Sequence, residues 1–431
     1  MTAPTVGLIG ILVLFSLIGF GMPIGFAMGL VGFTGFAFLV SFDAAIVRTG
    51  VTTYNLATNY AIGTVPLFLF MAHILFSAGI GRDLFDFAAK WIGRRRGGLA
   101  MATIGASAGF ASVNASSLAA TATMGLIALP EMRKHNYSLS LASGSVVAGG
   151  TIGSLIPPSG MLIIYGILTE TSIGRLFSAG IIPGILLALF YMIAVGIWCR
   201  VDPAAGPRGP KYSWREKLLS FTKIGEVLAL FVLVMGGIIG GWFTATEAGA
   251  VGAAGAILIA LIRRRLTLRS FRNAIYATLK TTGMIFGILF GAMVFNSFVT
   301  ATTIPMRVVD FVATGDFPPM VVLLLILLIY FFLGMILDAS AMMTLTVPLF
   351  FPIVTSLGFD AILFGVLVVR MTEIALITPP VGMNVYVLSG IAKDIPMTTM
   401  FRGAMPFVAA DVLHVTALIL FPPLVLWLAY L

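Results

Sequence analysis

The chain has 431 residues, of which 59% are hydrophobic and only 10% are charged, and its mean hydropathy is +1.09. This composition excludes a water-soluble globular protein and indicates a polytopic helical membrane protein. The single cysteine, Cys199, excludes an intrachain disulfide, and the net charge of +9 comes from basic residues in short loops, so it indicates membrane topology and not nucleic-acid binding.

The first half of the chain contains apolar segments of about the 20 residues that a membrane span needs. One of these segments has a polar middle at Ser112-Val-Asn-Ala-Ser-Ser117. In chain order we expect spans at 5–20, 22–40 and 64–80, a surface arm at 82–96, a hairpin at 98–131, a broken helix at 138–168 and a span at 174–199. Residues 1–200 would form a first repeat, followed by a cytoplasmic loop at 201–221.

The second half repeats this order over residues 222–431. Its polar-centred segment carries Asp338-Ala-Ser-Ala341. We expect spans at 222–240 and 244–262, a surface arm at 264–280, a span at 281–300, a hairpin at 318–356, a broken helix at 360–391 and a last span at 403–430. The sequence therefore predicts an all-α fold made of two repeats of about five spans each.

The basic residues decide how the two polar-centred segments cross the membrane. If both are re-entrant hairpins, one side collects all 25 Lys and Arg residues except Arg48, Arg175, Arg307 and Arg370. The positive-inside rule makes that side cytoplasmic, which leaves both termini outside. Since each half then has an odd number of spans, the halves have opposite orientations and form an inverted repeat.

Two broken spans are the strongest pointer to a functional site. Ser154-Leu-Ile-Pro-Pro-Ser-Gly-Met161 and Leu376-Ile-Thr-Pro-Pro-Val-Gly-Met383 each place two prolines and a glycine inside an apolar segment. Proline removes a backbone donor and disfavours helix at the preceding residue, so the chain unwinds there. Unwound backbone at this depth needs protein or a water-lined cavity, and a matched pair is typical of a transporter's binding site.

The chemistry at these positions suits ions. Freed carbonyls and the end of one half-helix favour a cation, whereas the start of the next half-helix favours an anion. Hydroxyl and amide side chains at the hairpin tips would complete oxygen-rich cages for a hard cation such as sodium. The alternative is that these small residues only allow close helix packing.

Arg370 is a charge near the middle of a predicted span, and such charges are usually functional. Three roles are open to it: an ion pair with Glu373 three residues later, binding of a substrate carboxylate, or a position facing a water-filled path. The sequence contains neither a phosphate-binding loop nor a convincing nucleophile with its base, so we expect no ATP-driven step and no enzyme.

The chain resembles the large membrane subunit of TRAP (tripartite ATP-independent periplasmic) transporters, the DctM-like permease or M subunit. The resemblance covers nearly the whole chain. It rests on Gly21-Met-Pro-Ile-Gly25, Val65-Pro-Leu-Phe68, Asn114-Ala-Ser-Ser-Leu-Ala-Ala-Thr121, Ile156-Pro-Pro-Ser-Gly160, Phe243-Thr-Ala-Thr-Glu-Ala248, Gly334-Met-Ile-Leu-Asp338 and Leu376-Ile-Thr-Pro-Pro-Val-Gly-Met-Asn384.

The resemblance implies an elevator-type, sodium-coupled symporter of the bacterial inner membrane, with no cofactor besides the coupling ion Na⁺. It implies a small four-helix Q subunit, a periplasmic binding protein and an organic acid anion such as a dicarboxylate, sugar acid or sialic acid. The sodium ligands would be Ser112, Asn114, Ser117, Thr151 and Gly153, and Asp338, Ser340, Thr378 and Gly382. We expect the substrate to be bound by Ser116, Pro158, Ser159, Pro380, Asn384 and Arg370.

Two other functions stay open on the sequence. One is a stand-alone sodium- or proton-coupled organic anion carrier that works without a binding protein. The other is an ion channel, because matched re-entrant hairpins do not exclude one.

Overall fold

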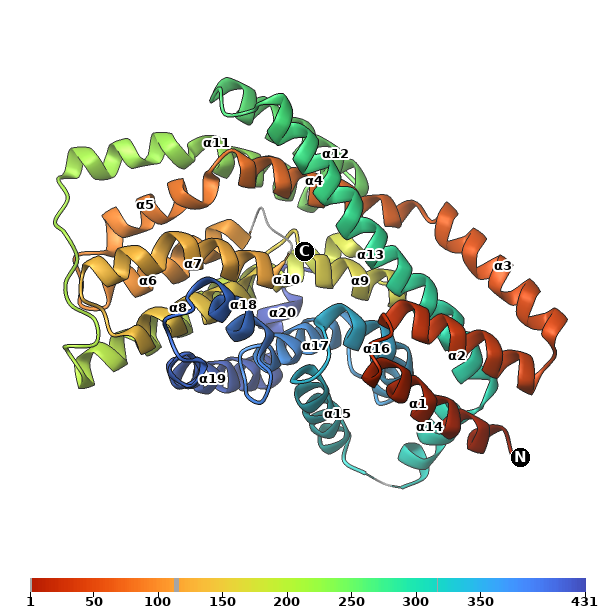
Figure 1. Ribbon diagram of the computed structural model, residues 1–431. Coiled ribbons are helices and arrows are strands. Elements are labelled where there is room, and N and C mark those ends of the chain that lie inside the picture. The colour runs from red at the N-terminus through yellow and green to blue at the C-terminus, as the bar shows by residue number, and fades with distance from the viewer. Residues whose placement is uncertain (1, 112–115, 316) are drawn as a thin grey trace.

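The computed structural model describes residues 2–111, 116–315 and 317–431, and within these ranges the chain is helical with no β-strand (Figure 1). In this part of the chain seven helices are long and apolar enough to cross a membrane. They are Tyr60–Ser77 (η1 with α4), α10 (Ile173–Val201), α11 (Trp214–Ile239), α12 (Ala245–Ile262), α13 (Leu268–Ala301), α16 (Ala339–Ser356) and α19 (Met397–Leu420). The predicted class, an all-α polytopic membrane protein, is confirmed.

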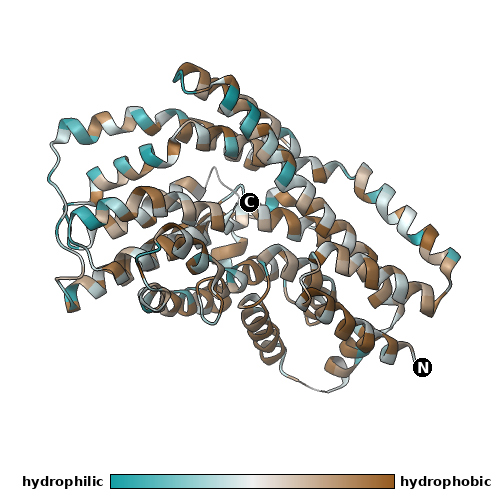
Figure 2. Cartoon of the chain, in the orientation of Figure 1, coloured by the Kyte–Doolittle hydropathy of each residue, from teal (hydrophilic) through white to brown (hydrophobic). Residues whose placement is uncertain are grey.

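Apolar residues predominate along most of the helices, as expected for helices of a membrane protein (Figure 2). Helix α15 (Pro319–Gly334) is apolar along its whole length, whereas hydrophilic residues gather along the arm helix α5 (Ile80–Ile92) and near one end of α11. The arm is amphipathic: it buries Leu84, Phe85 and Ala88 against its neighbours, so it takes the place of the surface arm predicted at 82–96.

The remaining scaffold differs from the expected boundaries in several places. Helices α1 (Ala3–Gly19) and α2 (Ile24–Leu39) are followed by α3 (Phe42–Thr58), a helix that was not expected because its sequence is more polar than a span. Helix α13 is continuous, so the predicted arm at 264–280 and span at 281–300 are one helix. A capping box between Ser213 and Glu216 starts α11 inside the predicted loop, and α19 ends before the short α20 (Pro423–Leu426).

Both predicted hairpins and both predicted broken helices are present in the described residues. The first hairpin consists of α6 (Gly98–Ala111) and α7 (Ser117–Lys134), and the second of α15 and α16. The first broken helix consists of α8 (Leu139–Thr151), the short 3₁₀ turn η2 (Ile152–Ser154) and α9 (Gly160–Thr169). The second consists of α17 (Ala361–Ala375) and α18 (Met383–Ile391). A further helix, α14 (Ile304–Thr314), lies between α13 and the second hairpin.

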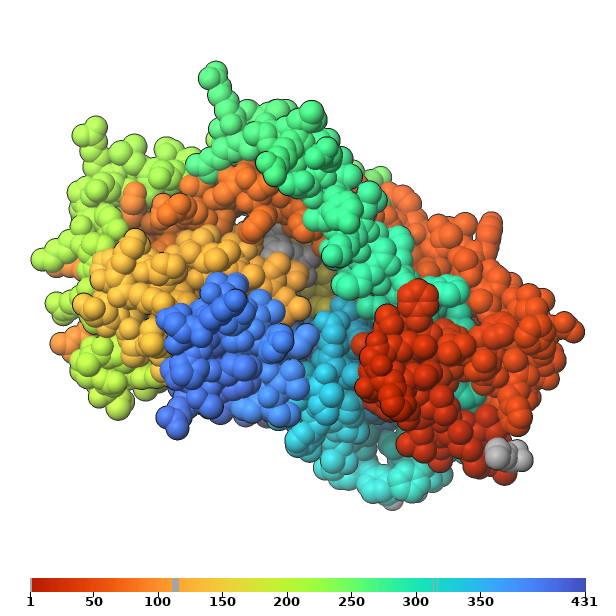
Figure 3. Space-filling view, in the orientation of Figure 1, coloured from red at the N-terminus to blue at the C-terminus, as the bar shows by residue number. Residues whose placement is uncertain are grey.

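The helices pair reciprocally between the two halves. Helix α2 packs on α13, and α12 packs on α4, so in both cases a scaffold helix of one half meets a scaffold helix of the other half. Each hairpin also packs on its own broken helix, α6 on α8 and α15 on α17. This is the arrangement expected of two inverted repeats. The first hairpin and the C-terminal helices form one surface in Figure 3, beside the surface formed by α2 and α13.

Glycines set the close approach of α2 and α13, as is common between membrane helices. A Cβ atom added at Gly291 would lie 1.9 Å from the carbonyl oxygen of Gly25, and one added at Gly25 would lie 2.5 Å from that of Gly287. We expect Gly291→Val to force the helices apart and destabilise the protein by about 1–3 kcal/mol or more. Gly283→Val on the same helix is the control, since nothing lies within 4 Å of its added Cβ.

The measurement is the unfolding temperature of the purified protein in detergent. The fold predicts a clear loss for Gly291→Val and little change for Gly283→Val. Equal losses in both variants would show that valine disturbs α13 itself and that the contact with α2 contributes little.

Candidate functional site

A cavity of about 130 Å³ lies where the two hairpin tips approach the two broken helices. Its polar lining comes from Ser116 and Ser117 at the first tip and from Asp338 and Ser340 at the second. Gly160 and Met161 of α9 and Glu373 and Leu376 at the second break add to this side. The opposite wall belongs to the scaffold helices α4 and α13 and is formed by Val65, Phe68, Leu69, Thr281, Met284 and Ile285.

The first tip is held by a carboxylate from the other repeat. The Ser117 hydroxyl, at the start of α7, lies 2.7 Å from each carboxylate oxygen of Glu373 in the last turn of α17. Ser116 is the N-cap of α7 and accepts a hydrogen bond from the Ala119 N–H at 3.4 Å. Glu373 is almost fully buried at 1% exposure, so this contact lies deep inside the protein.

The second tip is organised by its own acid. Asp338 is the N-cap of α16, and its Oδ2 accepts hydrogen bonds from the backbone N–H groups of Ser340 at 3.1 Å and Ala341 at 3.5 Å. N-cap aspartate satisfies amides that the first helical turn leaves free. The carboxylate also lines the cavity, so it can serve as a cap and as a cation ligand at once.

The breaks end one half-helix and start the next, as predicted. In the first, the peptide bond between Pro157 and Pro158 is cis, and Ser159 caps α9 by accepting a hydrogen bond from the Leu162 N–H at 3.3 Å. In the second, the bond between Pro379 and Pro380 is cis, and Gly382 precedes α18 with a φ of +57°. A left-handed φ favours glycine, which explains the Pro-Pro-x-Gly spacing here.

Arg370 is fully buried and pairs with Asp411 of α19, so of the three roles left open for it the ion pair is formed with a different acid than Glu373. Its Nη2 donates to Asp411 Oδ1 and lies 3.3 Å from the Tyr191 hydroxyl, which itself donates to Asp411 Oδ1 at 2.8 Å. The Tyr191 oxygen also lies 3.0 Å from Thr151 Oγ1. Arg370 and Glu373 share a helix, but their side chains bind groups on different neighbouring elements.

The predicted site residues fall into three groups. Four line the cavity: Ser116, Ser117, Asp338 and Ser340. The others in described parts of the chain lie behind it or flank the breaks: Thr151, Gly153, Pro158, Ser159, Arg370, Thr378, Pro380, Gly382 and Asn384. Ser112 and Asn114 lie outside the described residues.

Among the second group, several side chains are engaged locally. Thr378 Oγ1 donates to the Ile374 carbonyl at 2.7 Å, and Thr151 Oγ1 donates to the Ala148 carbonyl at 2.8 Å. The buried Asn384 contacts the Val147 carbonyl at 3.5 Å, and its Oδ1 has no hydrogen-bond partner among the described residues. The ligand roles of these residues stay predictions.

Sequence reasoning missed Asp411, Tyr191 and the apolar wall of the cavity. A signal for Asp411 was available, because it is an acid inside the apolar segment 403–430, and the rule that selected Arg370 applies to it equally. Met284 and Ile285 gave no such signal, since they look like any other lipid-facing or core residues of a span.

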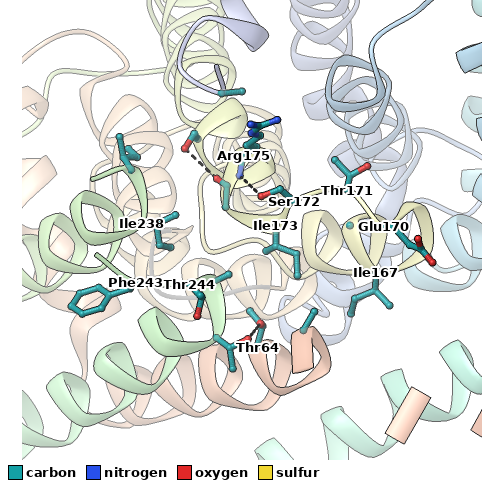
Figure 4. Close-up of a pocket in the computed structure, with 18 of the residues that line it drawn as sticks. Thr64, Ile167, Glu170, Thr171, Ser172, Ile173, Arg175, Ile238, Phe243 and Thr244 are labelled. Atoms are coloured by element: carbon teal, nitrogen blue, oxygen red, sulfur yellow. Dashed lines mark hydrogen bonds between the residues drawn. The ribbon is translucent and has the colours of Figure 1, made fainter. Parts of the chain in front are cut away.

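A larger cavity of about 640 Å³ lies at one end of the scaffold (Figure 4). It is lined by Thr64 of α4, by residues 170–172 between α9 and α10 with the first turn of α10 as far as Arg175, and by the turn before α12 with Phe243 and Thr244. None of the predicted ion or substrate residues lies in its described lining. Helices α4 and α9 contribute residues to both cavities: Thr64 and Gly166 line the larger one, and Val65 and Gly160 line the smaller one.

An exposed ion pair ties the first hairpin to the second broken helix. Arg133 at the end of α7 binds Asp394, in the linker after α18, with an N–O distance of 2.9 Å. The hydrogen bond from Arg133 holds the pKa of Asp394 below its ordinary value. The pair therefore contributes near neutral pH and is lost as the pH falls through that lowered pKa, although solvent keeps its contribution small.

Known proteins resemble this chain over almost its whole length. Residues 11–424 match the family described as tripartite ATP-independent periplasmic transporter, DctM component. The C4-dicarboxylate TRAP transporter large permease protein DctM of Pseudomonas aeruginosa is 35% identical over 378 residues, which are 87% of this chain and 88% of that protein. The sialic acid TRAP transporter large permease protein SiaM of Vibrio cholerae is 33% identical over 421 residues, 95% of each chain.

A solved structure supports the fold. The YdaH transporter of Alcanivorax borkumensis matches with a TM-score of 0.63 at 14% identity, covering 90% of this chain and 91% of that one. At this identity the likeness concerns the fold alone.

Proposed function

This chain belongs to the DctM component family of tripartite ATP-independent periplasmic (TRAP) transporters, and we propose that it is the membrane permease of a sodium-coupled importer of an organic acid anion. The observation that carries the proposal is the cavity between the two hairpin tips. Its polar side is built from hairpins and broken helices, and its other side is a mostly apolar wall of the scaffold helices α4 and α13.

The cavity offers sites for both signs of charge. Helices α7, α9 and α16 all begin at residues in or beside its lining, and helix N-termini favour anions. The carboxylates of Asp338 and Glu373 favour cations. Such a lining suits an organic anion that enters together with sodium.

The two-sided lining supports an elevator mechanism. The hairpins and broken helices would carry the bound solute as one rigid body. The mostly apolar side chains of α4 and α13 form few polar contacts, so this body could move along the scaffold. The larger cavity beside Arg175 would then be the periplasmic entrance, since Arg175 is on the side predicted to be periplasmic.

The names of the relatives suggest the class of cargo. A C4-dicarboxylate and sialic acid, named for two of them, both carry carboxylates. We propose a carboxylate-bearing solute for this chain as well, delivered by a periplasmic binding protein, with a small Q-type membrane subunit packed on the scaffold in the bacterial inner membrane.

The test is uptake into proteoliposomes that contain this chain with its Q-type partner. A panel of labelled organic acids would be supplied with and without an inward sodium gradient and the cognate binding protein. The proposal expects saturable uptake of one acid that needs both. Uptake that needs sodium alone would indicate a self-sufficient carrier, and non-saturating flux that ignores both would indicate a channel.

A further inference from the structure

Two segments on the side predicted to be cytoplasmic form a strongly basic surface. Residues 91–97, which follow the arm helix α5, contain three Lys and Arg residues, and residues 200–217, between α10 and α11, contain five more against two acids. Both acids serve backbone amides: Asp202 accepts a hydrogen bond from the Ala204 N–H at 3.1 Å, and Glu216 accepts one from the Ser213 N–H at 2.8 Å. Within the described chain, none of the eight basic residues forms an ion pair.

A backbone bridge holds two of these arginines opposite each other. Arg96 and Arg208 form an antiparallel β-bridge between the two segments, and the Gly97 N–H donates to the Gly206 carbonyl beside it at 2.8 Å. Side chains directly opposite in an antiparallel pair start about 5 Å apart at Cβ, and like charges in that position destabilise the pair. Both arginines are exposed, so their charged ends are available to an anion from outside the protein.

Close glycine packing fixes this arrangement. A Cβ atom added at Gly97 would lie 2.6 Å from Cys199 Sγ, near the end of α10, and one added at Gly206 would lie 2.5 Å from the same sulfur. The Gly209 N–H donates to the Gly93 carbonyl at 2.9 Å, and a Cβ at Gly209 would lie 2.6 Å from that oxygen. Since the two segments are seated tightly on each other and on α10, the fold itself keeps the arginines together.

Aromatic residues place this surface at the boundary between membrane and water. Trp91 and the exposed Trp214 pack edge to face with ring centroids 6.1 Å apart. The Lys217 ammonium lies 5.8 Å from the first centroid and 5.1 Å from the second. Tryptophan is enriched at the headgroup level of a bilayer. The spans α10 and α11 end and begin at this surface, and hydrophilic residues gather at this end of α5 and α11 (Figure 2).

We propose that the surface around the Arg96–Arg208 bridge, together with Arg94 and Arg95, binds the phosphodiester headgroup of an anionic phospholipid. A phosphate between the opposed guanidinium groups would replace their repulsion by charge-assisted hydrogen bonds. Basic clusters directly beside a membrane span favour anionic lipids through the same attraction. A free phosphate has this charge as well, but only a lipid places it at the depth that the tryptophans mark. The bound lipid would hold the arm and the loop before α11 at the membrane surface, whichever solute the protein carries.

The test uses the purified full-length protein in detergent and measures its unfolding temperature as a short-chain phosphatidylglycerol is added. Phosphatidylcholine is the neutral lipid, and inorganic phosphate is the anion without acyl chains. The variant Arg96→Gln with Arg208→Gln removes both charges of the bridge, and Arg96→Lys with Arg208→Lys keeps them. The matched control is Arg269→Gln with Arg272→Gln, which removes two exposed arginines of α13.

We expect phosphatidylglycerol to raise the unfolding temperature of the wild type more than phosphatidylcholine does, and inorganic phosphate to have little effect. The glutamine variant of the bridge should need about 10- to 30-fold more phosphatidylglycerol for half of the shift, because each basic residue near an anionic surface contributes a factor of about five. Without lipid it should be at least as stable as the wild type, since the opposed charges are gone. The control and the lysine variant should respond nearly as the wild type does.

Four results would overturn the proposal. Equal losses of the lipid response in the bridge variant and the control would assign the attraction to the whole basic face. Equal stabilisation by inorganic phosphate would indicate a site for a free anion. Equal effects of phosphatidylglycerol and phosphatidylcholine would exclude recognition of the charge. A glutamine variant that is less stable without lipid, yet keeps the wild-type response to phosphatidylglycerol, would make the two arginines structural residues of the bridge.

Discussion

Replacing Arg370 with alanine is expected to destabilise the protein by about 3–5 kcal/mol, because it leaves the Asp411 carboxylate buried without its cation. Both side chains are fully buried, and neither lines the described cavity between the tips. The loss should appear as a lower unfolding temperature and less monodisperse protein after solubilisation. The protein that remains folded should bind the substrate with nearly unchanged affinity.

The double variant Arg370→Met with Asp411→Leu separates a missing charge from a lost contact. Apolar residues of similar size often replace a buried ion pair at little cost, so we expect the double variant to be more stable than Arg370→Ala. The opposite pattern, normal stability with a large loss of substrate affinity in Arg370→Ala, would revive the hypothesis that Arg370 binds a substrate carboxylate.

The architecture could be predicted because local chemistry determines it. Two adjacent prolines followed by a glycine interrupt a helix, so both breaks could be located from the sequence. The basic residues favour re-entrant hairpins over full crossings, and that topology stays a prediction. None of these inferences required knowledge of which distant helices touch.

The site was harder to predict because its contacts join distant segments. The i,i+3 spacing suggested that Arg370 and Glu373 form a pair, yet the fold places Asp411 beside the first and Ser117 beside the second. Those partners are 41 and 256 positions away in sequence. Helix spacing reports which residues share a face, but neighbouring elements decide what each side chain binds: α19 supplies Asp411, and the start of α7 supplies Ser117.

Some of the predicted helix boundaries were also wrong. A change from basic to apolar residues suggested an arm before the span at 281–300, but no helix-breaking residue lies there and α13 continues through it. The polarity of residues 42–58 argued against a span, although it does not prevent an amphipathic helix with Ser41 as its cap, as in α3.

Asp338→Asn is expected to reduce sodium-driven uptake about 10- to 100-fold while leaving the protein nearly as stable as the wild type. Asparagine caps helices about as well as aspartate, so the variant keeps the hydrogen bonds from the Ser340 and Ala341 N–H groups and removes only the charge. Asp338→Ala removes the cap as well and should cost about 0.5–2 kcal/mol of stability in addition.

The comparison of these two variants assigns the role of Asp338. If the carboxylate binds sodium, both variants lose uptake, both need more sodium for half-maximal rate, and only alanine lowers the unfolding temperature in sodium-free buffer. If Asp338 is merely a cap, Asp338→Asn transports with the sodium dependence of the wild type. In that case Glu373 would be the one remaining carboxylate in the described cavity lining, and at most one sodium ion could have a charged ligand there.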